Sequence, residues 1–171
     1  MAHPISAFGA VHTVLSLIPV AAGLTALVRH GRIDPASRVG KIYVGGMVAS
    51  IFTSFGLSST GHFNAGHALG ILALVVMLVG TFAPRIAILG RAAVYLQTLA
   101  MSFSFFLLLV PGTNETLSRL PVGHPIGAGP DSPPVHAALV GLLILFLIGT
   151  TYQMLKLTGR LRSYLPRPNA Q

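Results

Sequence analysis

The chain has 171 residues, of which 53% are hydrophobic and only 8% are charged. An ordinary soluble domain carries about 25% charged residues, so this composition excludes a soluble globular surface and favours the lipid bilayer as solvent. The absence of cysteine excludes disulfides, iron–sulfur clusters and cysteine-bound zinc. The formal net charge is +8, but no basic patch is interleaved with aromatic residues, so we expect no nucleic-acid partner.

In chain order, five apolar stretches approach the ~20 residues that a transmembrane helix needs. They run approximately over residues 6–28, 40–59, 63–83, 91–111 and 134–155. Segments rich in Gly, Pro and polar residues separate them, and the longest, 112–133, is expected to be an irregular outer loop. The sequence therefore predicts one all-α domain over residues 1–171, an integral membrane bundle of about five transmembrane helices.

The basic residues predict the orientation of this bundle. Arg119 alone lies on one side of the predicted spans, and every other Lys and Arg lies on the opposite side. Basic residues mark the cytoplasmic side of membrane helices. We therefore expect a multi-pass protein of the inner (cytoplasmic) membrane with its N-terminus outside and its C-terminus in the cytoplasm.

Six of the seven histidines fall on the predicted outer side, and three of them lie inside spans. His12, His67 and His136 are at the outer ends of three different helices, at similar depths. Ionisable residues within spans are costly, usually face the bundle interior and are functional candidates. Histidine is also the commonest metal ligand. The three residues therefore predict a site for a metal or for a cofactor such as haem b or quinone.

A structural explanation of these histidines stays open beside the functional one. An imidazole near a helix end is also stable at the interface, bonded to water, a backbone carbonyl or a hydroxyl. His3, His62 and His124 are expected in solvated segments. Ser16 lies four residues after His12 and therefore on the same helical stripe.

Other residues carry further expectations about packing. Gly66 and Gly70 have the spacing that lets two helices approach closely, which would bring His67 toward a neighbour. Gln97 needs hydrogen-bond partners inside the bilayer and is expected to face the bundle interior. The tyrosines near cytoplasmic helix ends are expected to anchor the interface; they are Tyr43, Tyr95 and Tyr152. The acidic residues all lie in predicted loops, so no carboxylate relay inside the membrane is expected.

Four segments together resemble the DUF2306 group, a family of small bacterial membrane proteins of unknown function. They are the first span with His12, "RVGKIYV" at Arg38 to Val44, "GHALGILALVV" in the third span, and "GRAAVYLQTLAMSFSFF" at the fourth. The family usually has His-Arg shortly before the Gly of its second span, where this chain has Ala36 and Ser37. The resemblance implies a helical membrane bundle and supplies no reaction.

Three functions remain open on this evidence. The first is binding of a haem, metal or quinone through His12, His67 and His136. The second is a small transporter or channel that uses the polar residues of the second and fourth spans. The third is an accessory subunit without chemistry of its own, packed in the bilayer against a membrane protein partner or another copy of itself. The sequence does not decide whether the chain is an enzyme.

Overall fold

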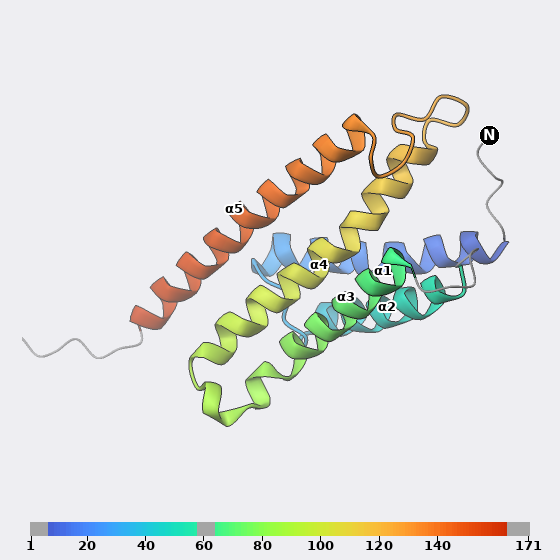
Figure 1. Cartoon of the computed structure of the whole chain (residues 1–171). Coiled ribbons are helices and arrows are strands. Elements are labelled where there is room, and N and C mark those ends of the chain that lie inside the picture. The colour runs from blue at the N-terminus through green and yellow to red at the C-terminus, as the bar shows by residue number, and fades with distance from the viewer. Residues whose placement is uncertain (1–6, 58–63, 164–171) are drawn as a thin grey trace, which may run out of the picture.

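The computed structural model describes residues 7–57 and 64–163, with the side chains of the last helix described up to Gly159. These ranges contain helices and no strand (Figure 1). The α-helices are α1 (Ala7–His30), α2 (Arg38–Phe55), α3 (Ala65–Phe82), α4 (Ala92–Arg119) and α5 (Pro133–Ser163). Two short 3-10 helices, η1 (Ala83–Arg85) and η2 (Ala87–Leu89), connect α3 to α4. The predicted all-α fold is confirmed.

Four of the five α-helices are long and apolar enough to cross a bilayer, which supports the predicted membrane protein. These stretches are Ala7–His30, Ala65–Arg85, Ala92–Arg119 and Pro133–Gly159. The remaining helix, α2, has 18 residues and is not among them. Basic side chains begin this helix and hydroxyl side chains end it, which lowers its apolar character: Arg38, Lys41, Ser50, Thr53 and Ser54.

The predicted outer loop at 112–133 is partly wrong, because α4 does not end at Pro111. The helix continues through this proline to Arg119. Two side-chain interactions lie in the added turns: the Thr116 hydroxyl donates to the Gly112 carbonyl at 2.7 Å, and Arg119 pairs with Glu115 one turn earlier. The i,i+4 ion pair stabilises the helix and offsets part of the cost of the internal proline. The irregular outer segment is therefore residues 120–132, and part of the sequence assigned to it is helical.

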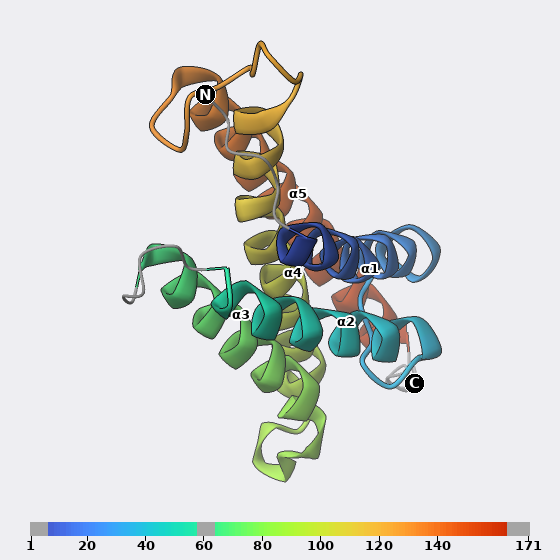
Figure 2. The same cartoon turned by 90° about the vertical axis from the view of Figure 1, so that its right-hand side faces the viewer.

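The helices pack as two antiparallel pairs, α1 with α2 and α3 with α4, and α5 lies along α4 (Figures 1 and 2). Glycines permit the closest approaches. A Cβ atom on Gly46 would lie 2.9 Å from the Pro19 ring of α1, and one on Gly80 would lie 2.9 Å from the Met101 sulfur of α4. Of the predicted pair Gly66 and Gly70, a Cβ atom on Gly66 would meet only the Asn64 side chain among the described residues, whereas one on Gly70 would lie in ordinary contact with α2, 3.5 Å from Phe55 and 3.6 Å from Ile51.

The core lies where α1, α2, α3 and α4 meet, and one of its largest side chains is Tyr43. The prediction that Tyr43 anchors the membrane interface is wrong, because its side chain is 0% exposed. Its hydroxyl bonds the Ser104 hydroxyl of α4 at 2.8 Å. Ser104 in turn donates to the Met101 carbonyl at 2.9 Å. A buried tyrosine with a satisfied hydroxyl therefore ties the α1–α2 pair to α4.

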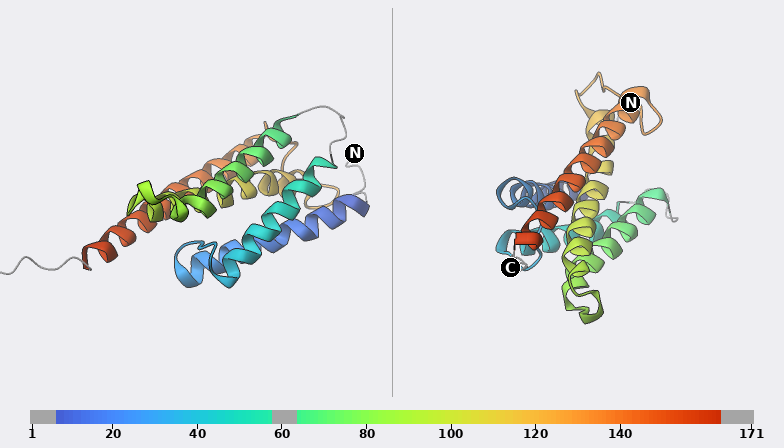
Figure 3. Two further views of the ribbon diagram at one scale, coloured as in Figure 1. Left: turned by 90° about the horizontal axis from the view of Figure 1, so that it is seen from below. Right: turned by 90° about the vertical axis from the view of Figure 1, so that its left-hand side faces the viewer.

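The segments that connect the helices lie at two ends of the bundle. Residues 31–37, residues 83–91 and the C-terminal end of α5 lie toward one end (Figures 1 and 3). The start of α1, the end of α2 and residues 120–132 lie toward the other. The segments that carry most of the basic residues thus lie toward the same end of the bundle as well as on the same side of the predicted spans.

Candidate functional site

His12 is the predicted site residue that the structure places in a polar cluster between helices. Its Nδ1 lies 2.8 Å from the Thr53 hydroxyl of α2, and its Nε2 lies 3.3 Å from the Ser16 hydroxyl one turn later on α1. The Ser16 hydroxyl also lies 2.7 Å from the Ser50 hydroxyl of α2. The expectation that His12 and Ser16 share one helical stripe is confirmed. We call these four side chains the His12 cluster.

The hydroxyl protons of the His12 cluster fix the roles of the imidazole nitrogens. Thr53 donates to the backbone carbonyls of Ala49 and Ser50, at 2.9 and 3.0 Å. Because its one proton is engaged there, Thr53 accepts from His12, and Nδ1 carries the imidazole proton. Ser16 donates to the His12 carbonyl at 2.8 Å, which is closer than Nε2. In this tautomer Nε2 of His12 carries a lone pair, and the Ser16 hydroxyl at 3.3 Å lies beside it.

His67 has a local structural role at the start of α3. It is the third residue of that helix, and Asn64 is the N-cap. The Asn64 side chain accepts from the His67 backbone N–H at 3.1 Å, and His67 Nδ1 accepts from the Asn64 backbone N–H at 3.3 Å. The ring also stacks on Phe55 of α2, with centroids 5.3 Å apart. This capping box accounts for a histidine at this position without a ligand.

His136 lies in the first turn of α5, where its side chain is exposed. Within residues 7–57 and 64–163, no group of three or more His, Asp or Glu side chains is arranged to hold a metal ion. The structure thus places His12, His67 and His136 in three separate surroundings. His3 and His62 lie outside the described residues.

A second polar link between distant helices was not singled out from the sequence. Gln153 of α5 is buried; its Oε1 accepts from the Ser102 hydroxyl of α4 at 2.8 Å, and its Nε2 donates to the Gly31 carbonyl at 2.9 Å. The sequence does indicate this link, because an amide side chain in an apolar helix needs hydrogen-bond partners. The same argument predicted an inward-facing Gln97, whose side chain is indeed buried at 7% exposure.

Comparisons with known proteins add no identification, because no family model, no curated protein and no solved structure matches this chain. The resemblance to the DUF2306 group stays a prediction.

Proposed function

We propose that this chain is a multi-pass protein of the cytoplasmic membrane with the start of α1 outside. The apolar helices support the membrane location. The orientation rests on the basic residues, since the described segments that carry them, apart from the end of α4 with Arg119, lie toward the end of the bundle that holds residues 31–37 and 83–91. That end faces the cytoplasm under the positive-inside rule.

Reporter fusions test this orientation. Fusions after Arg32, Arg85 and Arg160 are expected to show cytoplasmic reporter activity, and a fusion after Gly127 is expected to show activity on the outer side. The matched comparison is Arg85 with Gly127, because α4 is the only helix of membrane-spanning length between them. Activity of both reporters on the same side of the membrane would contradict a membrane-spanning α4 and remove the proposed topology.

We further propose that the outer half of the bundle binds a small redox cofactor, a quinone or a haem, with His12 in contact with it. The observation that carries this proposal is the oriented imidazole. The Nδ1–H of His12 donates to the Thr53 hydroxyl, so Nε2 presents a lone pair to a quinol hydroxyl or to a haem iron. A histidine oriented by a hydrogen bond at its other nitrogen is typical of ligand-binding histidines. His67 and His136 stay outside this proposal because of their separate surroundings.

An absorption spectrum and quinone extraction of the detergent-purified protein test the proposed cofactor. The wild-type protein is expected to show a Soret band or to retain quinone, and His12→Ala is expected to lose it because the donor atom is gone. His136→Ala is the matched control, since its side chain is exposed, and should keep the wild-type content. A wild-type protein without haem or quinone, purified from its native membrane, would end this proposal.

An accessory role is the second candidate, and the position of α5 favours it. This helix packs mainly along α4, and a Cβ atom on Gly141 or Gly149 would meet no atom of the described residues within 4 Å. Small residues on an uncovered helix face allow close helix contact in membranes. Mild solubilisation of a tagged chain should then recover a membrane partner in fixed ratio, and Gly149→Leu should weaken that recovery.

A further inference from the structure

A hollow of about 540 Å³ opens beside the end of α1. The end of α1, the following turn and one face of α5 form its walls. Three cationic side chains reach it, Arg29, Arg32 and Lys156, and three apolar or aromatic ones extend it toward the spans, Leu27, Val28 and Tyr152. We call it the basic hollow. It lies at the end of the bundle where most basic residues gather, and the His12 cluster does not contribute to it.

The charge of the basic hollow is strongly one-sided. Its only carboxylate among the described lining residues is Asp34, which is already engaged with the Arg32 guanidinium at 3.3 Å and with the Ala36 backbone N–H at 3.0 Å. Lys156 forms no ion pair with a described residue and lies over the Tyr152 ring, 5.5 Å from its centroid. The hollow therefore carries an excess of positive charge, which an anion would neutralise.

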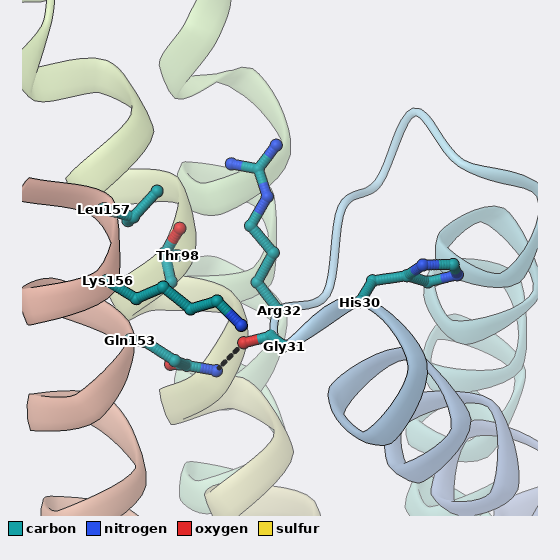
Figure 4. A pocket seen from close by; sticks show the side chains of 7 residues that line it. All are labelled: His30, Gly31, Arg32, Thr98, Gln153, Lys156 and Leu157. Atoms are coloured by element: carbon teal, nitrogen blue, oxygen red, sulfur yellow. Dashed lines mark hydrogen bonds between the residues drawn. The ribbon is translucent and has the colours of Figure 1, made fainter. Parts of the chain in front are cut away.

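One backbone carbonyl at the end of α1 is already engaged, which lessens the repulsion that a helix C-terminus exerts on an anion. Gly31 has a φ of +73°, a conformation that favours glycine, and its N–H donates to the Leu27 carbonyl at 2.9 Å. The Gly31 carbonyl, which would repel negative charge, accepts from Gln153 instead, as the dashed line in Figure 4 shows. Lys156 reaches from α5 toward Gly31, and the His30 ring points away (Figure 4).

A small recess beside the basic hollow contains a buried hydroxyl. A recess of about 20 Å³ adjoins Gly31, Arg32 and Lys156, and Thr98 of α4 lines it (Figure 4). The Thr98 side chain is 1% exposed, and its Oγ1 has no hydrogen-bond partner among the described residues. Buried hydroxyls are normally paired. The recess has room for about one oxygen atom, so this donor is placed to bind a ligand oxygen or a bridging water.

We infer that the basic hollow binds the phosphate group of an anionic ligand, and that the ligand is a phospholipid of the cytoplasmic leaflet. Arginine and lysine recognise phosphate oxygens through charge-assisted hydrogen bonds. Basic pockets between membrane helices on the cytoplasmic side bind anionic head groups. The apolar wall supports a lipid source, because Val28 is 77% exposed beside the cations and offers a surface for an acyl chain.

Native mass spectrometry of the full chain in detergent tests this inference with two defined lipids. Phosphatidylglycerol should bind more tightly than phosphatidylcholine. Lys156→Gln should weaken phosphatidylglycerol binding about fivefold, the effect of about one surface cation. Arg91→Gln is the matched control, since Arg91 is an exposed cation near the same end of the bundle but outside the hollow. Equal binding by both variants, or equal binding of both lipids, would overturn the lipid site.

Inorganic phosphate distinguishes a lipid phosphate from a free phosphate ion as the ligand of the basic hollow. If the ligand is a lipid, phosphate at constant ionic strength should neither displace phosphatidylglycerol nor raise the thermal stability of the protein. Phosphate that raises the stability of the wild type and of Arg91→Gln, but not of Lys156→Gln, would assign the hollow to a free anion instead. If neither phosphate nor lipid distinguishes these two variants, the basic hollow is not a binding site.

Thr98→Val separates a binding role of the hydroxyl from a structural one. Valine keeps the shape and removes a buried hydroxyl without a protein partner, so the ligand-free variant should be at least as stable as the wild type. Its affinity for phosphatidylglycerol should nevertheless fall. Unchanged affinity in a folded Thr98→Val variant would show that the hydroxyl does not contact the ligand or its bridging water.

Discussion

Gly40→Ala is expected to lower the free energy of unfolding by about 3 kcal/mol, at the upper end of the range for overpacked positions. A Cβ atom on Gly40 would lie 1.8 Å from the Asp34 carbonyl oxygen and 3.0 Å from the Pro35 Cα atom. These are backbone atoms, so no side-chain rotation relieves the contact. The turn before α2 must move, which also breaks the bond from the Gly40 N–H to the Ser37 hydroxyl at 2.9 Å. Unfolding in mixed micelles, followed by helical circular dichroism, measures the loss.

Gly45→Ala is the matched control for this substitution. It lies on the same helix, and a Cβ atom there would meet nothing within 4 Å. Alanine favours helix over glycine by about 0.5–1 kcal/mol, so this variant should be neutral or slightly more stable. Equal destabilisation by both variants would mean that glycine matters for α2 in general and that the contact with Asp34 does not.

Gly23→Ala is expected to cost about 1–3 kcal/mol, because it overpacks the contact between α1 and α4. A Cβ atom on Gly23 would lie 2.5 Å from two ring atoms of Phe105 and 3.3 Å from the Tyr43 ring. Phe105 is buried against Tyr43, with ring centroids 6.2 Å apart, so its ring has little room to retreat. The same micelle unfolding experiment measures the change.

A double variant identifies Phe105 as the cause. Phe105→Leu alone removes ring contacts and should destabilise the protein, but in the Gly23→Ala background it also removes the clash. The two changes should therefore be non-additive, with the double variant more stable than the sum of the single effects predicts. Additive effects would show that the Cβ atom is accommodated elsewhere.

The number and approximate positions of the helices could be predicted from the sequence, because long apolar runs have one stable backbone solution in a bilayer. Their ends were harder to predict. Pro111 indicated an end of α4, but hydrogen bonds and an ion pair in the following turns continue the helix. Tyr43 was assigned to the interface from its place near a helix end, and the rotation of α2 turns it into the core instead.

The candidate site was predictable only in part for the same reason. His12 and Ser16 are one turn apart on one helix, so their contact follows from the sequence. Their partners Ser50 and Thr53 depend on how α2 is rotated against α1, which no local pattern specifies. The depth of His67 in its predicted span is typical of a ligand. In the structure its side chain instead forms a capping box at the start of α3 with Asn64, three residues earlier. The depth of a histidine in a predicted span therefore does not distinguish a ligand from a capping residue.

The bond between Gln153 and Gly31 joins residues 122 positions apart, and this separation has a consequence for biogenesis. The α1–α2 pair and the α3–α4 pair are each built from helices that are neighbours in the sequence. The wall that α5 gives to the basic hollow is synthesised last. Arg29 and Arg32 are therefore made before Lys156 and Gln153, and the complete hollow exists only in a chain whose final helix has packed against the rest.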